Sequence, residues 1–208
     1  MLWSLPVALL AAFVLSRVRF PGRTMLDAFV HLPLVLPPVA VGYLLLLLFG
    51  MNGPIGRSLY QAFGVQLAFT KAGAALATAG MTFPLMVRSI RIALEGVDRG
   101  LEAAARTLGA GPFDRFATIT LPLMLPGVLA GAVTAFAAAL GEFGAVITFV
   151  SNIPGETRTL PLALYTAIQS PNGDAVALRL AILSFVLGLT GLVLAELLAR
   201  GLRRRLGR

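Results

Sequence analysis

Apolar residues fill five stretches of the chain, and short polar or basic segments separate them. The stretches are residues 1–16, 29–49, 68–87, 123–149 and 178–199. About 20 residues cross the hydrocarbon core of a bilayer as a helix, so the last four are long enough to span it. The first is short, which indicates either an abbreviated span or a true start that lies upstream. The pattern therefore predicts an all-α polytopic membrane bundle of about five transmembrane helices.

Prolines and an acidic residue mark two of these stretches. Pro33, Pro37 and Pro38 lie inside the second, where proline removes backbone hydrogen bonds and kinks a helix. Such a span is expected to pack in a bundle or to line a pathway. Glu142 lies near the outer end of the fourth stretch, two residues before Gly144. We expect its carboxylate to bond locally to backbone groups, although an intramembrane acid is also a functional candidate.

The connections outside the membrane are rich in glycine and proline. Residues 50–66 are predicted to be an external loop, and residues 151–177 an external segment with a short helix near 162–169.

The most informative connection is the polar segment 95–122, which we call the coupling segment. Val97, Leu101, Ala105 and Leu108 recur at helical spacing, and Glu102 can pair with Arg106 on the polar face. Gly109 follows the last apolar residue, where a left-handed cap suits a residue without Cβ. This half of the segment is therefore predicted to be a short amphipathic helix.

The second half of the coupling segment is predicted to be another short helix. Pro112 suits the first turn of a helix, and Asp114 favours its exposed N–H groups. Pro122 is expected to end the unit and to lead into the fourth span. A helix–break–helix surface between membrane spans is suited to receive a push from a soluble partner.

Composition and charge support a membrane protein and exclude most soluble classes. Hydrophobic residues make up 58% of the 208 residues, charged residues make up 12%, and the mean hydropathy is +0.89. The formal net charge is +8, but the basic residues lie at the ends of the apolar stretches rather than on one surface. The sequence has no cysteine and one histidine, so we do not expect a structural metal site.

The distribution of basic residues predicts the orientation of the chain. If 17–28, 88–121 and 200–208 are cytoplasmic, thirteen of the 17 basic residues lie inside. These thirteen are Arg17, Arg19, Arg23, Arg88, Arg91, Arg99, Arg106, Arg115, Arg200, Arg203, Arg204, Arg205 and Arg208. The positive-inside pattern therefore predicts five spans with an external N-terminus and a cytoplasmic C-terminus.

The sequence carries no constellation of catalytic residues. It lacks the G-x-x-x-x-G-K-[ST] phosphate loop, so the chain is not expected to hold ATP itself. It also lacks an intramembrane row of acids that could relay protons. These features favour a conduit that is driven by a partner protein.

The coupling segment resembles the EAA loop of ABC importer permeases. Gly109 is followed by nine residues and then by Ile119-Thr-Leu-Pro122, which is the spacing of that loop. The resemblance implies a type I importer permease fold over residues 1–208 and a loop that sits in a groove of the ATPase subunit.

The resemblance also selects candidate residues. The candidate coupling residues are Glu102, Ala103, Ala104, Arg106, Gly109, Ile119, Leu121 and Pro122. The candidates for the pathway or its structure are Pro37, Pro38, Glu142 and Gly144. The family's usual glutamate position is occupied here by Ala103, so Glu102 is displaced by one residue. An ordinary amphipathic cytoplasmic loop is the competing interpretation.

Further segments resemble the permease subunits of molybdate importers. They are His31–Val39, Phe83–Arg88, Ala104–Gly111, Gly141–Ala145 and Phe149–Thr159. The resemblance implies a homodimer in the bacterial inner membrane, two copies of an ATPase subunit that bind ATP and Mg²⁺, and an extracytoplasmic molybdate-binding protein. It implies no cofactor on this chain.

The substrate is expected to meet only weak contacts inside the membrane. The predicted mid-membrane positions offer hydroxyls, such as those of Thr78, Thr134, Ser184 and Thr190, and almost no basic residues. Burying a divalent oxyanion without partners is costly, so affinity is expected to reside in the binding protein. A tungstate or sulfate permease is also compatible with the sequence. A secondary transporter and a membrane scaffold are less favoured, because neither explains the Gly109–Pro122 spacing.

Overall fold

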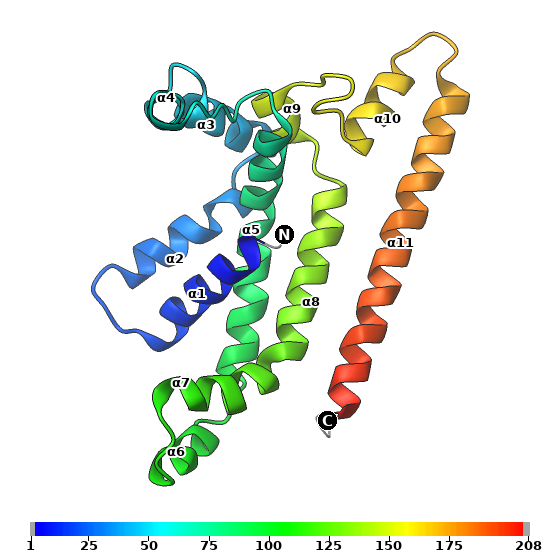
Figure 1. Cartoon of the computed structure of the whole chain (residues 1–208). Helices are drawn as coiled ribbons and strands as arrows, with labels where there is room; N and C mark the ends of the chain where they lie inside the picture. The colour runs from blue at the N-terminus through cyan, green and yellow to red at the C-terminus, as the bar shows by residue number, and fades with distance from the viewer. Residues whose placement is uncertain (1–2, 206–208) are drawn as a thin grey trace. The chain divides into compact units, whose positions relative to one another are not determined.

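The computed structural model describes residues 3–205, apart from the side chains of residues 195, 198, 199 and 202–205. Every regular element in the described residues is helical, which confirms the predicted all-α class (Figure 1). The chain forms two compact units. The first contains residues 1–29, 83–136 and 191–208, and the second contains residues 30–82 and 137–190.

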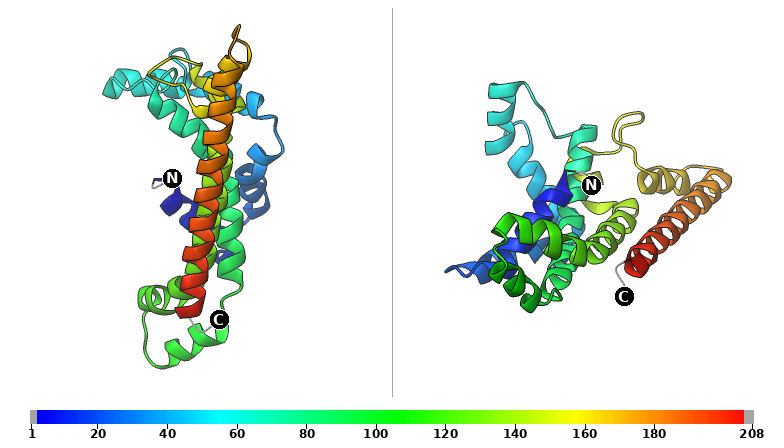
Figure 2. Two further views of the ribbon diagram at one scale, coloured as in Figure 1. Left: turned by 90° about the vertical axis from the view of Figure 1, so that its right-hand side faces the viewer. Right: turned by 60° about the horizontal axis from the view of Figure 1, so that its bottom comes forward.

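The first unit contains α1 (Ser4–Arg17) and most of α2 (Arg23–His31), followed by the C-terminal half of α5 (Lys71–Glu95). It continues through α6 (Arg99–Thr107), α7 (Pro112–Arg115), a π-helical turn η2 (Phe116–Thr120) and most of α8 (Leu121–Leu140). The end of α11 (Asp174–Arg205) completes it. Figure 2 shows α11 as one uninterrupted helix.

Small residues bring α5 and α8 into close contact within the first unit. A Cβ on Gly127 would lie 2.3 Å from the Cβ of Ala93, and one on Gly131 would lie 2.7 Å from the Cβ of Ser89. The Ser89 hydroxyl also donates a hydrogen bond to the Gly127 carbonyl at 3.1 Å. Glycines four residues apart let two helix backbones approach, as is typical of membrane helix pairs.

The second unit contains η1 (Leu32–Leu34), α3 (Pro38–Phe49), α4 (Pro54–Phe63) and the N-terminal half of α5. It also contains α9 (Gly144–Val150), α10 (Leu160–Ile168) and the first part of α11. Its core includes Val146, Phe149 and Val150 of α9, with Ala77 of α5 and Leu162 of α10.

Helices α3 and α9 cross closely because two glycines leave room at the crossing. A Cβ on Gly42 would lie 2.6 Å from the Ala145 carbonyl oxygen, and one on Gly144 would lie 2.7 Å from the Cβ of Pro38. Two of the candidate pathway residues, Pro38 and Gly144, therefore contact each other at this crossing.

The predicted count of about five spans is not confirmed. In the described residues, two helical stretches are long and apolar enough to cross a membrane, namely 112–140 and 174–194. A third is present if Arg23–Leu34 and Pro38–Phe49 count as one span, although they are bent by 114° relative to each other. Helix α1 is apolar but shorter.

Four predicted segments differ from the helices of the structure. The stretch 29–49 is broken, because Pro37 and Pro38 lack N–H groups and force extended backbone before α3. The stretch 123–149 is broken between α8 and α9. The predicted loop 50–66 contains α4, and α5 continues to Glu95 rather than ending at residue 87.

Candidate functional site

Local backbone chemistry shapes the coupling segment at three residues, two of which the sequence predicts. The Asp98 carboxylate accepts a hydrogen bond from the Gly100 N–H at 2.7 Å and so caps the start of α6. Gly109 has a φ of +88°, which confirms the predicted left-handed break after α6. Pro112 occupies the first turn of α7, also as predicted.

Pro122 does not end the helix, which corrects the expectation from sequence. The helix that begins at Pro112 continues to Leu140, and Pro122 is the second residue of α8. Proline has no N–H for the carbonyl four residues earlier, and its ring crowds that carbonyl. The wider π-helical turn Phe116–Thr120, directly before α8, accommodates the proline without a break.

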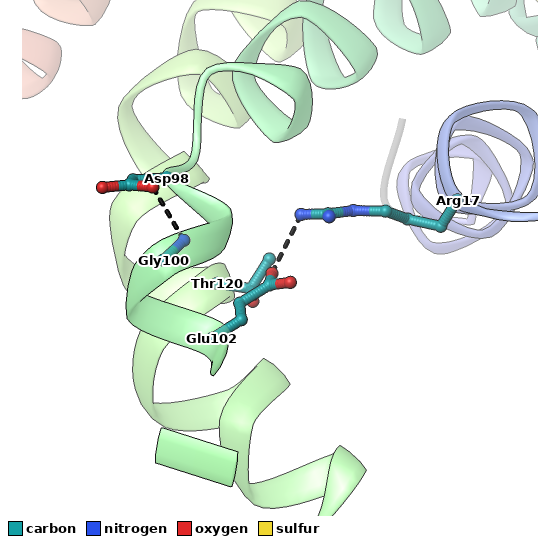
Figure 3. Close-up of polar contacts among 5 residues, drawn as sticks. All are labelled: Arg17, Asp98, Gly100, Glu102 and Thr120. Carbon is teal, nitrogen blue, oxygen red and sulfur yellow. Dashed lines mark hydrogen bonds and ion pairs between the residues drawn. The ribbon is translucent and has the colours of Figure 1, made fainter. Parts of the chain in front are cut away.

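Glu102 links the coupling segment to α1 (Figure 3). Its Oε1 atom accepts a hydrogen bond from the Arg17 guanidinium at 2.9 Å and another from the Thr120 hydroxyl at 2.7 Å. The side chains of Arg17 and Glu102 are 15% and 23% exposed, and Thr120 is buried. The predicted Glu102–Arg106 pair is wrong, because the carboxylate turns inward to Arg17 and Thr120 while Arg106 is exposed.

An aromatic contact and a small hollow lie beside this network. The rings of Phe13 and Phe116 meet edge to face with centroids 5.9 Å apart. A hollow of about 190 Å³ is lined by these two rings together with the following residues: Arg17, Glu102, Pro112, Arg115 and Thr120. Helix α1 therefore contacts both halves of the coupling segment.

A second ionic contact ties α2 to α5. The Arg91 guanidinium donates to Asp27 and to Glu95, at 2.9 Å in each case. The hydrogen bonds to Glu95 and Asp27 raise the pKa of Arg91, so this residue, outside the predicted span, stays charged.

An apolar groove also lies on the coupling segment, and its lining shares no residue with the hollow beside α1. It has a volume of about 490 Å³ and is lined by Leu101, Ala104, Ala105, Leu108, Thr118, Ile119, Pro122 and Leu123. Leu108 is 88% exposed, and nearby in the sequence Phe113 is 82% exposed. The groove and its surroundings therefore present exposed apolar side chains on a polar segment.

The structure separates the candidate coupling residues into groups. It brings Ala104, Ile119 and Pro122 together in the apolar groove, whereas Ala103 and Arg106 are exposed outside it. Leu121 is half-buried and does not line the groove. Glu102 lines the hollow against α1 instead.

The candidate residues of the second unit have structural contacts. The Glu142 carboxylate accepts a hydrogen bond from the Ala145 N–H at 2.9 Å, which confirms the expected local bonding. Pro37 precedes the first residue of α3 and has extended backbone. Within the described residues, no group of three or more acidic or histidine side chains could hold a metal ion.

Sequence reasoning missed Arg17, Thr120 and Asp98 as functional or structural partners. Arg17 and Glu102 are 85 positions apart, so no local pattern pairs them. Asp98 had a detectable signal, since an acidic residue directly before an amphipathic helix is a typical N-cap.

The fold and the coupling segment define a membrane permease of a binding-protein-dependent importer. The chain matches the family model "Binding-protein-dependent transport system inner membrane component" over residues 4–204, and it belongs to this family.

Within the family, the chain is similar to curated molybdenum permeases. It is 60% identical over 207 residues to the molybdenum transport system permease protein ModB of Escherichia coli K12, covering 100% of this chain and 90% of that protein. The ModB of Haemophilus influenzae is 53% identical with the same coverage. The sulfate transport system permease protein CysT of Salmonella typhimurium is 40% identical over 172 residues, covering 81% of this chain and 62% of that protein.

Solved structures share the fold. A bacterial ABC transporter for the import of the polysaccharide alginate has a TM-score of 0.70 at 18% identity, covering 96% of this chain and 73% of that chain. The MetNI methionine ABC transporter has a TM-score of 0.68 at 18% identity, covering 97% and 92%. At this level of identity the likeness concerns the fold alone.

Proposed function

We propose that this chain is the transmembrane permease subunit of an ATP-driven importer for molybdate. The observation that carries the proposal is the 60% identity to ModB over the whole chain. The chain forms the translocation pathway as one permease domain over residues 1–208, and a separate ATPase subunit holds ATP and Mg²⁺.

The apolar groove of the coupling segment is the part that receives the ATPase subunit. Leu101 and Leu108 are 46% and 88% exposed, and docking against a partner would remove this apolar surface from water. Displacement of the groove during ATP hydrolysis would act on α8, because α7, η2 and α8 form one helix. Gly109 sets the angle between α6 and α7 in this scheme.

Glu102 contributes from inside the permease rather than at the docking surface. Its carboxylate is bonded to Arg17 and Thr120, so the shift of one residue from the family's usual glutamate position gives it an internal partner. The bonds hold α6 against η2 and α1 while the groove is displaced.

The remaining assembly follows from the proposed class. The functional unit is a homodimer of this chain in the inner membrane with two ATPase subunits. An extracytoplasmic molybdate-binding protein delivers the oxyanion. The positive-inside pattern supports an external N-terminus and a cytoplasmic C-terminus.

The pathway itself holds the anion weakly. The hydroxyls of Thr78, Thr134 and Ser184 donate to carbonyls of their own helices, at 2.9, 2.9 and 2.8 Å. These hydroxyls therefore offer lone pairs rather than donors, and lone pairs repel an oxyanion. Specificity then resides in the binding protein.

Sulfate import is the second candidate function, because the chain is 40% identical to the sulfate permease CysT. This identity favours sulfate import over a secondary transporter or a membrane scaffold. Tungstate shares the charge and tetrahedral shape of molybdate and is a third substrate to compare.

The deciding experiment measures ATP hydrolysis by the chain reconstituted with its ATPase subunit and binding protein. Molybdate, tungstate and sulfate are added separately over a range of concentrations. Stimulation by molybdate at the lowest concentration supports the proposal. Stimulation by sulfate alone changes the substrate, and failure to assemble with any ATPase subunit overturns the permease role.

A further inference from the structure

A basic hollow lies on the first unit, separate from the apolar groove. It has a volume of about 520 Å³ and is lined by Ser16, Arg17, Arg19, Arg23, Glu95 and Arg99. The lining comes from the end of α1, the turn after it, the start of α2, the end of α5 and the start of α6. Four of the six lining residues are therefore arginines from separate segments.

The charges of this hollow are not balanced by the protein. Arg17 is paired with Glu102, and Glu95 shares Arg91 with Asp27, so Glu95 remains a partly neutralised carboxylate on the hollow. Arg19, Arg23 and Arg99 form no ion pair with any residue that the structure describes. Three unpaired guanidinium groups around one hollow repel each other, and an anion between them would remove that repulsion.

The donors suit a tetrahedral oxyanion. Guanidinium groups present planar, paired N–H donors that match phosphate geometry, and the charge-assisted bonds they form are strong. The Ser16 hydroxyl oxygen is inaccessible to solvent and has no hydrogen-bond partner among the described residues. It lines the same hollow, but a bound anion would contact it only after the side chain rotates.

The positive-inside pattern explains only part of this arrangement. It accounts for basic residues beside membrane spans, but it does not require that three arginines without an ion pair surround one hollow.

We propose that this hollow binds a phosphate-type oxyanion group, supplied either by an anionic phospholipid headgroup or by a free tetrahedral anion. Bound there, the anion connects Arg19, on the turn after α1, and Arg23, the first residue of α2, with Arg99 at the start of α6. Occupancy therefore stabilises the coupling segment against α1, in addition to the Arg17–Glu102 bond. The site does not depend on which substrate the importer carries.

The test uses the full chain in lipid nanodiscs. Binding of inorganic phosphate and of molybdate is measured in discs of phosphatidylcholine, and thermal unfolding is compared between these discs and discs that contain phosphatidylglycerol. The variants are Arg99→Gln and the triple variant Arg19→Gln, Arg23→Gln, Arg99→Gln. The matched control, Arg57→Gln, Arg158→Gln, Arg179→Gln, removes the same charge from exposed positions of the second unit.

The proposal expects anion binding or stabilisation by phosphatidylglycerol in the wild type. Arg99→Gln should weaken the effect about tenfold or more, because it removes a charge-assisted hydrogen bond to the anion. The triple variant should abolish it, and the control should retain it. An effect of free anions in phosphatidylcholine identifies a soluble ligand, whereas an effect of phosphatidylglycerol alone identifies the headgroup.

Three results would overturn the site. They are a wild type that responds to neither probe, a triple variant that responds like the wild type, and a control that loses the response equally. The last result would mean that net charge, rather than the hollow, attracts the anion. None of these results bears on transport of molybdate, so the two proposals fail separately.

Discussion

At the scale of single residues, the Arg17–Glu102 pair differs from the exposed ion pairs of the chain in its burial. Its side chains are 15% and 23% exposed, whereas those of Arg200 and Glu196 are 66% and 47% exposed. Exposed pairs contribute little to stability because water screens them, while loss of one partner from a buried pair leaves an uncompensated charge.

Glu102→Gln is therefore expected to destabilise the chain by about 1–3 kcal/mol. The amide keeps the length of the side chain and a bond to Thr120 but loses the ion pair. Denaturant unfolding of the detergent-solubilised chain measures the effect. Glu196→Gln is the control and should change stability by no more than about 1 kcal/mol. Equal effects of the two substitutions would contradict the importance of burial.

Substitutions at Gly109 and Gly111 of the coupling segment distinguish the effect of backbone strain from the effect of side-chain size. Gly109 has a φ of +88°, Gly111 has a φ of −68°, and neither would place a Cβ within 4 Å of other atoms. Gly109→Ala is therefore strained by its backbone alone, by about 1–2 kcal/mol, and Gly111→Ala is not.

We expect Gly109→Ala to reduce ATPase stimulation by substrate in the reconstituted complex, because the break between α6 and α7 changes. Gly111→Ala should behave like the wild type. Expression and thermal unfolding of both variants are measured alongside. A loss of stimulation in both variants would show that the segment tolerates no added methyl group, which contradicts a role for the left-handed backbone.

At the scale of elements, the sequence predicts helix chemistry better than helix ends. The break at Gly109 and the helix start at Pro112 are predictable from the sequence, because each depends only on the backbone preference of that residue. The extension of α5 to Glu95 is not predictable from the sequence, because it depends on packing of Ser89 and Ala93 against the glycines of α8. The same limit applies to Arg17 and Glu102, whose contact joins distant segments.

The crossing of α3 and α9 gives a test at this scale. A Cβ on Gly42 would meet the backbone of Ala145, with contacts of 2.6 and 2.9 Å. We expect Gly42→Ala to destabilise the second unit by about 1–3 kcal/mol, since backbone cannot move aside cheaply. Gly188→Ala is the control, because its Cβ would have no neighbour within 4 Å. Thermal unfolding in detergent compares them, and an unchanged midpoint for Gly42→Ala would refute the close crossing.

At the scale of the whole molecule, the apolar groove predicts how the chain assembles. Leu108 is 88% exposed, so its substitution should leave folding unchanged. Leu108→Gln is expected to weaken association with the ATPase subunit about tenfold, which corresponds to loss of one well-packed apolar anchor.

Co-purification with the ATPase subunit, followed by titration of the purified partners, measures this association. Val65→Gln, at a position that is 44% exposed in the second unit, is the control and should leave assembly unchanged. Wild-type association of the Leu108→Gln chain would remove the groove from the proposed docking surface.

The helix from Pro112 to Leu140 carries one further consequence. At 1.5 Å per residue its 29 residues form a rod about 44 Å long, with the apolar groove near one end. A sideways displacement at one end of such a helix tilts its far end, although the widened turn and Pro126 interrupt its regular backbone hydrogen bonds. The π-helical turn before Pro122 lies about a quarter of the way along this rod. In the proposed importer, a displacement at the groove therefore reaches the rest of α8 through this widened turn.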